Sequence, residues 1–263
     1  MKRKNLSAKK KIHNFYLNKL NNPKIKKIYL KFKKNLENLN ENKFCIAVSG
    51  GSDSMALVFL SKCYSIQRKV KFYYYIVDHK LREESTTEAR LVRRQLKKFD
   101  VNCNILTWKH KKSISNIQSK ARDNRYRLIF KECLKKKINF VLTAHQKDDL
   151  FENFFIRLIR GSGLKGLSSF NKTKAKIIKE NNIYILRPLL NIYKKDLIYI
   201  TNSTFNYFAK DPSNDNDNFL RIKIRKLIKK LNKEGLDYKK LKLSFDNLHQ
   251  SNLAIEHYVK KNI

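Results

Sequence analysis

Four short apolar runs, each separated from the next by a segment with helical periodicity, dominate residues 43–144 and limit the folds that this chain can adopt. The runs are rich in the β-branched and aromatic residues that favour strands, and the segments between them are long enough for helices. They are FCIAV (44–48), KFYYYIV (71–77), CNILTW (103–108) and FVLTA (140–144). This alternation predicts an α/β fold, a doubly wound parallel sheet with helices on both faces. Ligands of such sheets bind at the carboxyl ends of the strands.

Helical segments are expected on both sides of this region. Residues 1–36 contain no Asp or Glu, and their Lys and Arg recur among apolar residues, which predicts a basic amphipathic extension. After Gly166 we expect a short strand at 183–186, a helix from about Tyr193, a polar loop at 211–218, and helices at 219–232 and 237–261. The expected division is therefore an N-terminal extension at 1–42, an α/β domain at 43–200 and a helical C-terminal segment at 201–263.

The charge balance points to a polyanionic partner. The 263 residues include 60 Lys and Arg but 22 Asp and Glu, a formal net charge of +38, and the 41% of hydrophobic residues suffice for a core. Such a surface attracts nucleic acid, although compositional drift in an AT-rich genome is an alternative source of part of the charge. No apolar run is long enough to span a bilayer, so we expect no membrane partner. The four cysteines form no CxxC pair, which fits free thiols in a reducing, cytoplasmic protein.

Five of the six glycines lie in two clusters. The first cluster directly follows the 44–48 strand and precedes a helix. It is the loop Ser49, Gly50, Gly51, Ser52, Asp53 and Ser54. A strand, a glycine turn and a helix amino terminus together supply backbone N–H groups and a positive dipole end, which suit a phosphate. The alternative is an ordinary helix start capped by Ser52 or Asp53. The loop lacks the GxxxxGK[ST] pattern of the Walker P-loop.

The second cluster, GSGLKG at 161–166, matches GxGxxG in form only. It follows a helical segment instead of a strand, so we reject a dinucleotide site. Two interpretations stay open: the carboxyl-terminal cap of a helix, and an anion-binding loop flanked by Arg157, Arg160 and Lys165.

Carboxylates gather after the 140–144 strand, in TAHQKDDLFEN. Asp149 and Glu152 are three residues apart and so share one face of a helix. Together with Asp148 they can attract Mg²⁺ bridging phosphates, or an ammonium group. The alternative is that these acids complement the dipole of a helix amino terminus. His145 receives no acid–base role.

Two further groups are expected near the same edge of the sheet. Asp78 and His79 close the 71–77 strand, and ARDNRYR supplies Arg122, Arg125 and Arg127. These arginines either clamp phosphates through bidentate hydrogen bonds or lie on a solvated face.

Taken in order, SGGSDS, VDHKLREES, ARDNRY and TAHQKDDLFEN…RLIRGSGLKGL resemble the PP-loop family of N-type ATP pyrophosphatases and, within it, the tRNA(Ile)-lysidine synthetases. RPLL at 187–190 and DPSNDNDNFLRIKIR at 211–225 extend the resemblance, which covers about residues 43–225. It implies an adenine nucleotide hydrolase-like α/β fold. It also implies that ATP adenylates the 2-carbonyl oxygen of the first anticodon cytidine of an isoleucine tRNA. Free L-lysine then displaces AMP, and pyrophosphate is the other product.

The resemblance assigns roles by position. Ser49 to Ser54, with Asp78 and His79, are expected to hold ATP, and Asp53 and Asp149 to hold Mg²⁺. The catalytic group is expected to be Asp53, Arg122, Asp149, Glu152 and Arg221. Arg122 and Arg221 would neutralise charge on the adenylate. Asp149 and Glu152 would receive lysine, although which carboxylate deprotonates it stays open.

This chain departs from the family pattern at Ile222, where Asn is usual, and at Lys210, where many members have Glu. The basic N-terminal segment and the final helices are expected to contact the tRNA electrostatically. A PP-loop tRNA thiolase, a small-molecule ligase and a non-catalytic RNA-binding module remain alternatives, and the oligomeric state, including a homodimer, stays open.

Overall fold

The computed structural model describes residues 2–109, 117–168, 174–178, 183–209 and 220–262. The chain divides into two compact units. Unit 1 comprises residues 1–145 and 174–210, and unit 2 comprises residues 146–173 and 211–263. Each unit is thus assembled from two separate stretches of sequence. The segments expected from sequence, 1–42, 43–200 and 201–263, remain a prediction about domain organisation.

A six-stranded sheet forms the centre of unit 1, in the order β3-β2-β1-β4-β6-β5. Five strands are parallel, and β5 pairs antiparallel with β6 at the edge. The bounds are β1 Lys43–Val48, β2 Lys71–Asp78, β3 Cys103–Thr107, β4 Phe140–Leu142, β5 Lys174–Ile178 and β6 Ile183–Leu186. The expected strands and the doubly wound α/β class are confirmed. The antiparallel edge strand β5 was not expected.

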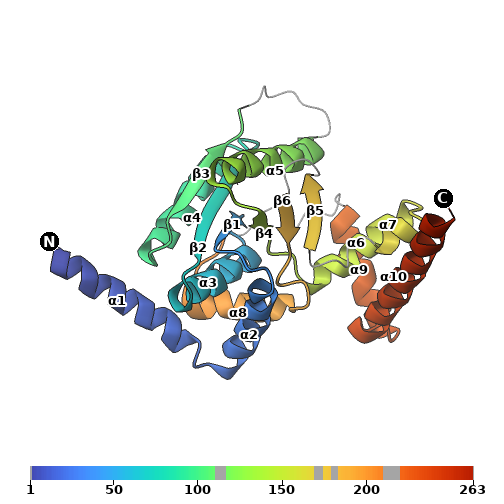
Figure 1. The fold of residues 1–263 in the computed structure, drawn as a ribbon, viewed down its shortest axis with the longest axis horizontal. Coiled ribbons are helices and arrows are strands. Elements are labelled where there is room, and N and C mark those ends of the chain that lie inside the picture. Colours follow the sequence, from blue (N-terminus) through green and yellow to red (C-terminus); the bar gives the residue numbers. More distant parts are fainter. Residues whose placement is uncertain (1, 110–116, 169–173, 179–182, 210–219, 263) are drawn as a thin grey trace. The chain divides into compact units, whose positions relative to one another are not determined.

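Helices cover both faces of this sheet (Figure 1). One core packs α3 (Ser52–Gln67), α4 (Ser85–Lys98) and α8 (Lys194–Thr204) against one face. The other core lies under α5 (Ile117–Lys136), where Ile129, Phe130 and Cys133 contact residues of β1, β2, β4 and β6. Because β1 lies in the middle of the sheet, the glycine loop at its carboxyl end lies near the centre of the edge where the parallel strands end.

The first two helices belong to the core of unit 1. These are α1 (Lys2–Lys19) and α2 (Pro23–Glu37). The apolar positions of α2 recur at helical spacing and are buried: Ile25, Ile28, Tyr29, Phe32 and Leu36. The ring of Tyr16 in α1 is fully buried and stacks against Phe59 of α3 at 5.6 Å between centroids. Removal of residues 1–36 would therefore remove part of the hydrophobic core of unit 1 as well as positive charge.

Unit 2 is helical where the structure describes it. It contains α6 (Lys147–Ile159), α7 (Leu164–Ser168), α9 (Leu220–Lys233) and α10 (Tyr238–Lys261), which confirms the two expected C-terminal helices. Aromatic contacts join α6 to α10, with 4.9 Å between the ring centroids of Phe154 and Phe245 and 5.4 Å between those of Phe151 and Tyr238. Across the described residues of both units, every helix is too short or too polar to span a bilayer.

Candidate active site

The glycine loop lies between β1 and α3, at the carboxyl edge of the sheet in unit 1. Gly50 has φ of +84°, in the left-handed region, and a Cβ built on it would lie 2.6 Å from Cγ2 of Val92. Both observations restrict this position to glycine. The loop is ordered by Ser54, whose hydroxyl donates to the carbonyl of Gly51 at 2.9 Å and accepts from the N–H of Ser49 at 3.2 Å.

The amino terminus of α3 has no side-chain cap. Its cap position is Gly51, in an extended conformation, so the alternative in which Ser52 or Asp53 caps the helix is wrong. Both residues instead lie in the first turn, where the hydroxyl of Ser52 is 3.2 Å from Oδ1 of Asp53. The first N–H groups of a helix have no acceptor within the helix, and the dipole is positive there. This end of α3 is therefore suited to an anionic group.

Asp78 holds the loop that follows β2. Its buried carboxylate accepts hydrogen bonds from the hydroxyls of Thr86 at 2.7 Å and Ser85 at 3.0 Å, and from the N–H of Lys80 at 3.0 Å. Burial opposes ionisation, but these donors outweigh it and lower the pKa of Asp78 below its usual value. Asp78 is thus placed at the expected edge, where its carboxylate joins the loop after β2 to the first turn of α4.

His79 and the arginines of α5 lie on the described part of unit 1. Nε2 of His79 accepts a hydrogen bond from Nε of Arg125 at 3.1 Å, and the imidazole meets Trp108 edge-on at 6.2 Å. The guanidinium of Arg122 is exposed and lies 5.6 Å from the ring centroid of Tyr126. Arg122 therefore remains accessible to a solute, whereas Arg125 positions the imidazole.

In unit 2, Asp149 takes part in the amino-terminal cap of α6. Its Oδ2 accepts from the N–H of Gln146 at 2.8 Å, while the side chain of Gln146 accepts from the N–H of Asp148 at 2.9 Å. This is the capping box that satisfies the first donors of a helix. Asp149 is only half-buried.

Glu152, one turn further along α6, is 2% exposed and forms an ion pair with Arg225 of α9. Nε of Arg225 lies 2.5 Å from Oε1 of Glu152. Burial raises the pKa of the Glu152 carboxyl, although Arg225 and the exposed Arg221 counteract the rise. Burial also works against the charge of Arg225, but Glu152 outweighs it and raises the pKa of the guanidinium.

Arg225 was missed by the sequence reasoning. It lies 73 positions from Glu152, so the pair is formed by tertiary packing. The usable signal was its spacing of four residues from Arg221, which places both arginines on one side of α9.

The second glycine cluster forms a helix end. Gly161, with φ of +69°, follows α6, and the N–H of Ser162 donates to the carbonyl of Arg157 at 3.0 Å. Nη1 of Arg157 donates to the carbonyl of Gly166 at 2.6 Å and so closes the loop. The interpretation of this cluster as a helix cap is confirmed. Arg157, one of the arginines of the anion-binding interpretation, is hydrogen-bonded to the loop itself.

The structure thus places two parts of the expected site, the glycine loop in unit 1 and the acids in unit 2. That Asp53 and Asp149 together hold Mg²⁺ stays a prediction. Lys210 and the polar loop at 211–218 lie outside the described residues, and Ile222 is buried in α9.

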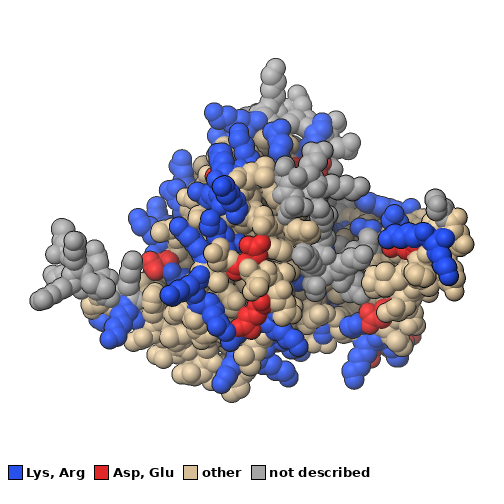
Figure 2. All heavy atoms as spheres, in the orientation of Figure 1, with Lys and Arg blue, Asp and Glu red and all other residues tan. Residues whose placement is uncertain are grey.

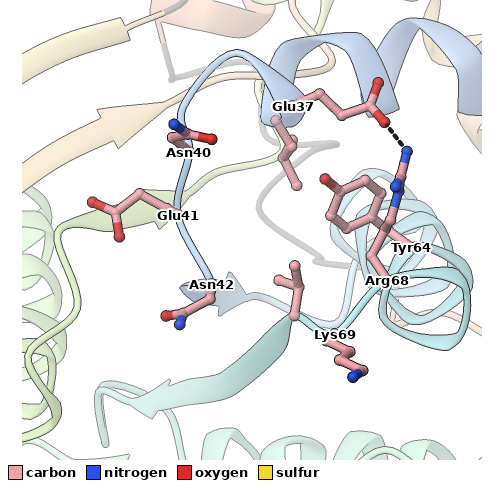
Figure 3. Close-up of a pocket in the computed structure, with 9 residues that line it drawn as sticks. Glu37, Asn40, Glu41, Asn42, Tyr64, Arg68 and Lys69 are labelled. Carbon is pink, nitrogen blue, oxygen red and sulfur yellow. Dashed lines mark hydrogen bonds and ion pairs between the residues drawn. The ribbon is translucent and has the colours of Figure 1, made fainter.

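A hollow of about 410 Å³ lies elsewhere on unit 1 (Figure 3). Its polar lining includes Asn42, just before β1, and the ion pair of Arg68 with Glu37 at 2.7 Å. Residues before β1 and β2 are at the amino ends of these strands, so this hollow is on the opposite edge from the glycine loop.

Known proteins match most of the chain. A family model described as a PP-loop domain matches residues 24–231. A tRNA(Ile)-lysidine synthase of Orientia tsutsugamushi (strain Boryong) is 42% identical over 189 residues, which are 72% of this chain and 42% of that protein. One of Rickettsia felis is 38% identical over 231 residues, 86% of this chain and 51% of that protein. The chain therefore spans about half the length of these curated relatives, or less.

A solved structure has a similar fold. It is a U34-tRNA thiolase, NcsA from Methanococcus maripaludis, with a TM-score of 0.71 at 17% sequence identity over 86% of this chain and 79% of that one. At this identity the likeness concerns the fold alone.

Proposed function

Because this chain belongs to the PP-loop domain family, we propose that it is a ligase that uses ATP to join free L-lysine to an isoleucine tRNA. The observation that carries the proposal is the loop between β1 and α3, where Gly50 allows a tight turn and α3 begins without a side-chain cap. A relative named tRNA(Ile)-lysidine synthase is 42% identical to this chain over 189 residues, which supports the choice of substrates.

The proposed reaction has two steps. The 2-carbonyl oxygen of the first anticodon cytidine attacks the α-phosphorus of ATP, and pyrophosphate leaves. The lysine amine then attacks carbon 2 of the cytosine, the carbon–oxygen bond breaks, and AMP leaves. The amine must lose a proton before or during this attack.

The glycine loop has the groups needed to hold the triphosphate. The N–H groups at the start of α3 suit phosphate oxygens because they are donors at the positive end of a helix dipole. Asp53, in the first turn, offers carboxylate oxygens of the kind that Mg²⁺ prefers alongside phosphates, with Asp149 as the proposed second ligand. When bound, Mg²⁺ would neutralise phosphate charge. Asp78 supports this edge by fixing the loop after β2 and the start of α4.

The acids of unit 2 are proposed to bind the lysine substrate. Asp149 is half-buried at the start of α6, and we assign this carboxylate to the lysine ammonium. Burial raises the pKa of Glu152, and the ion pair of this carboxylate holds Arg225 in place. The exposed guanidinium groups of Arg122 and Arg221 are proposed to offset charge on the adenylate.

The surface supports a nucleic-acid substrate. Lys and Arg side chains spread over much of the described surface in view, and Asp and Glu occupy few places (Figure 2). In addition, α9 carries five exposed lysines: Lys223, Lys226, Lys229, Lys230 and Lys233. Contacts of lysine with phosphates supply affinity without reading bases.

The state of the cysteines favours ligation over sulfur transfer. All four thiols are buried. Burial raises the pKa of Cys103 to about 12 and holds the pKa of Cys45 well above its ordinary value. A sulfur carrier needs an accessible thiolate at neutral pH, and these environments disfavour one.

The direct test is incubation with ATP, Mg²⁺, labelled lysine and bulk tRNA, followed by nucleoside analysis. We expect the label in a modified cytidine of tRNA. AMP formation with no label in any nucleoside would assign another nucleophile, and the absence of AMP together with retained tRNA binding would favour a non-catalytic RNA-binding module.

A further inference from the structure

The glycine loop accepts hydrogen bonds from α8 and from the residues that follow this helix. The hydroxyl of Thr201 in α8 donates to the carbonyl of Ser52 at 2.7 Å. The N–H of Ala209 donates to the carbonyl of Gly50 at 2.9 Å. Both donors belong to unit 1, as the loop does. The carbonyls of Gly50 and Ser52 are therefore both fixed by residues far along the chain.

The bond of Thr201 is not the usual one for a threonine in a helix. A helical threonine ordinarily donates to a carbonyl of its own preceding turn. Thr204, three residues later in α8, does so, with 2.7 Å from its hydroxyl to the carbonyl of Ile200. The hydroxyl of Thr201 instead crosses to a residue 149 positions away. Thr201 is fully buried and Thr204 is 6% exposed, so burial does not account for the difference.

Peptide geometry gives these bonds a consequence for the loop's donors. All described peptide bonds are trans, and in a trans peptide the C=O and the following N–H point in opposite directions. A bond that draws the carbonyl of Gly50 toward Ala209 aims the N–H of Gly51 away from it. In the same way, a bond that draws the carbonyl of Ser52 toward α8 aims the N–H of Asp53 away from α8.

We propose that Thr201 is a positioning residue for the nucleotide: its hydroxyl, together with the N–H of Ala209, orients the loop's N–H groups toward the phosphates. This inference rests on the proposed use of ATP at this loop. It does not require that lysine or tRNA be the other substrates.

The test is calorimetric titration of the full chain with ATP and Mg²⁺, at a temperature well below unfolding. Thr201→Val keeps the size of the side chain and removes the hydroxyl. One lost neutral hydrogen bond predicts binding about threefold to tenfold weaker. Thr201→Ser keeps the donor and is expected to recover most of the affinity.

Thr204→Val is the matched control, because it removes a buried hydroxyl that bonds within its own helix. It is expected to lower the unfolding temperature about as much as Thr201→Val while ATP binds as in the wild type. Thr201→Ala repeats the test without a β-branched replacement if the valine variant does not fold. Wild-type affinity in the Thr201 variants without a hydroxyl, or an equal loss in Thr204→Val, would overturn the inference. Failure to form lysidine by a chain that binds ATP would overturn the proposed function alone.

Discussion

At the scale of single residues, the structure separates groups that shape the site from groups that can contact a solute. Gly50 and Asp78 are of the first kind, since one permits the turn and the other orders a loop through three accepted hydrogen bonds. Arg122 and Arg221 are exposed and of the second kind. Substitutions in the two groups should therefore affect different measurements.

Gly50→Ala is expected to destabilise the protein and weaken ATP binding together. The new Cβ would lie 2.6 Å from Val92, in a backbone region that alanine rarely adopts. The strain predicts a loss of about 1–3 kcal/mol in unfolding free energy. Gly51→Ala is the control for stability, because its Cβ would only touch Ser49 at 3.8 Å. Equal unfolding temperatures for the two variants would contradict this account of Gly50.

The lowered pKa of Asp78 predicts how the stability of the protein depends on pH. Its pKa is lowered in the folded state, so its contribution to stability is present above the unfolded-state pKa and is lost as pH falls through the folded value. Asp78→Asn lacks this titration. Melting curves between neutral pH and about pH 3 should show the wild type losing its advantage over the variant below about pH 4. A constant difference across this range would show that Asp78 does not act through its charge.

At the scale of elements, the Glu152–Arg225 pair joins α6 to α9 within unit 2. Arg225→Met leaves a buried carboxylate without this partner. We expect a loss of about 2–3 kcal/mol, less than for a fully buried pair because Arg225 is partly exposed. Denaturant unfolding measures it. The control is Lys229→Met on the exposed side of the same helix, and adding Glu152→Gln to Arg225→Met should restore part of the loss. If the double variant is no more stable than Arg225→Met, the charge of Glu152 is not the cause.

The exposed face of α9 is expected to contribute to tRNA affinity by neutralising phosphates. Changing Lys223, Lys229 and Lys230 to Gln should raise the KM for tRNA. It should also lower the slope of log affinity against log salt by about 0.7–0.9 for each phosphate that is no longer neutralised. The KM for ATP should not change. Three exposed lysines of α4 and α5, Lys97, Lys98 and Lys131, provide a comparison of equal charge outside the segments expected to contact tRNA. Equal effects of the two sets would attribute tRNA binding to net charge instead of to particular surfaces.

At the scale of the whole molecule, much of the fold of unit 1 could be predicted from the sequence because its strands are central. Buried parallel strands must be continuously apolar, so 44–48 and 71–77 were recognisable from their side chains alone. The edge strand β5 was not, since KAKII has charges that only an edge tolerates. The apolar stripe of α2 was expected on a basic amphipathic extension, but the sequence did not show that it packs into the core of unit 1.

The site could be predicted only where its chemistry is local. The glycine loop is contiguous in sequence, so its place between a strand and a helix was foreseeable. The bonds that arrange it come from residues far along the chain, such as Thr201 to Ser52, and the Glu152–Arg225 pair is likewise distant in sequence. A single sequence carries no signal for which distant polar residues meet, because that depends on how helices pack.

In the proposed function, one chain couples cleavage of ATP between its α- and β-phosphates to the attachment of lysine to tRNA. The most direct measurement follows pyrophosphate, AMP and labelled lysine in tRNA in the same reaction. We expect all three to form in equal amounts and no AMP to form without tRNA. We also expect Asp53→Asn to abolish all three while tRNA still binds. Formation of ADP and phosphate, or lysine incorporation without pyrophosphate, would contradict it.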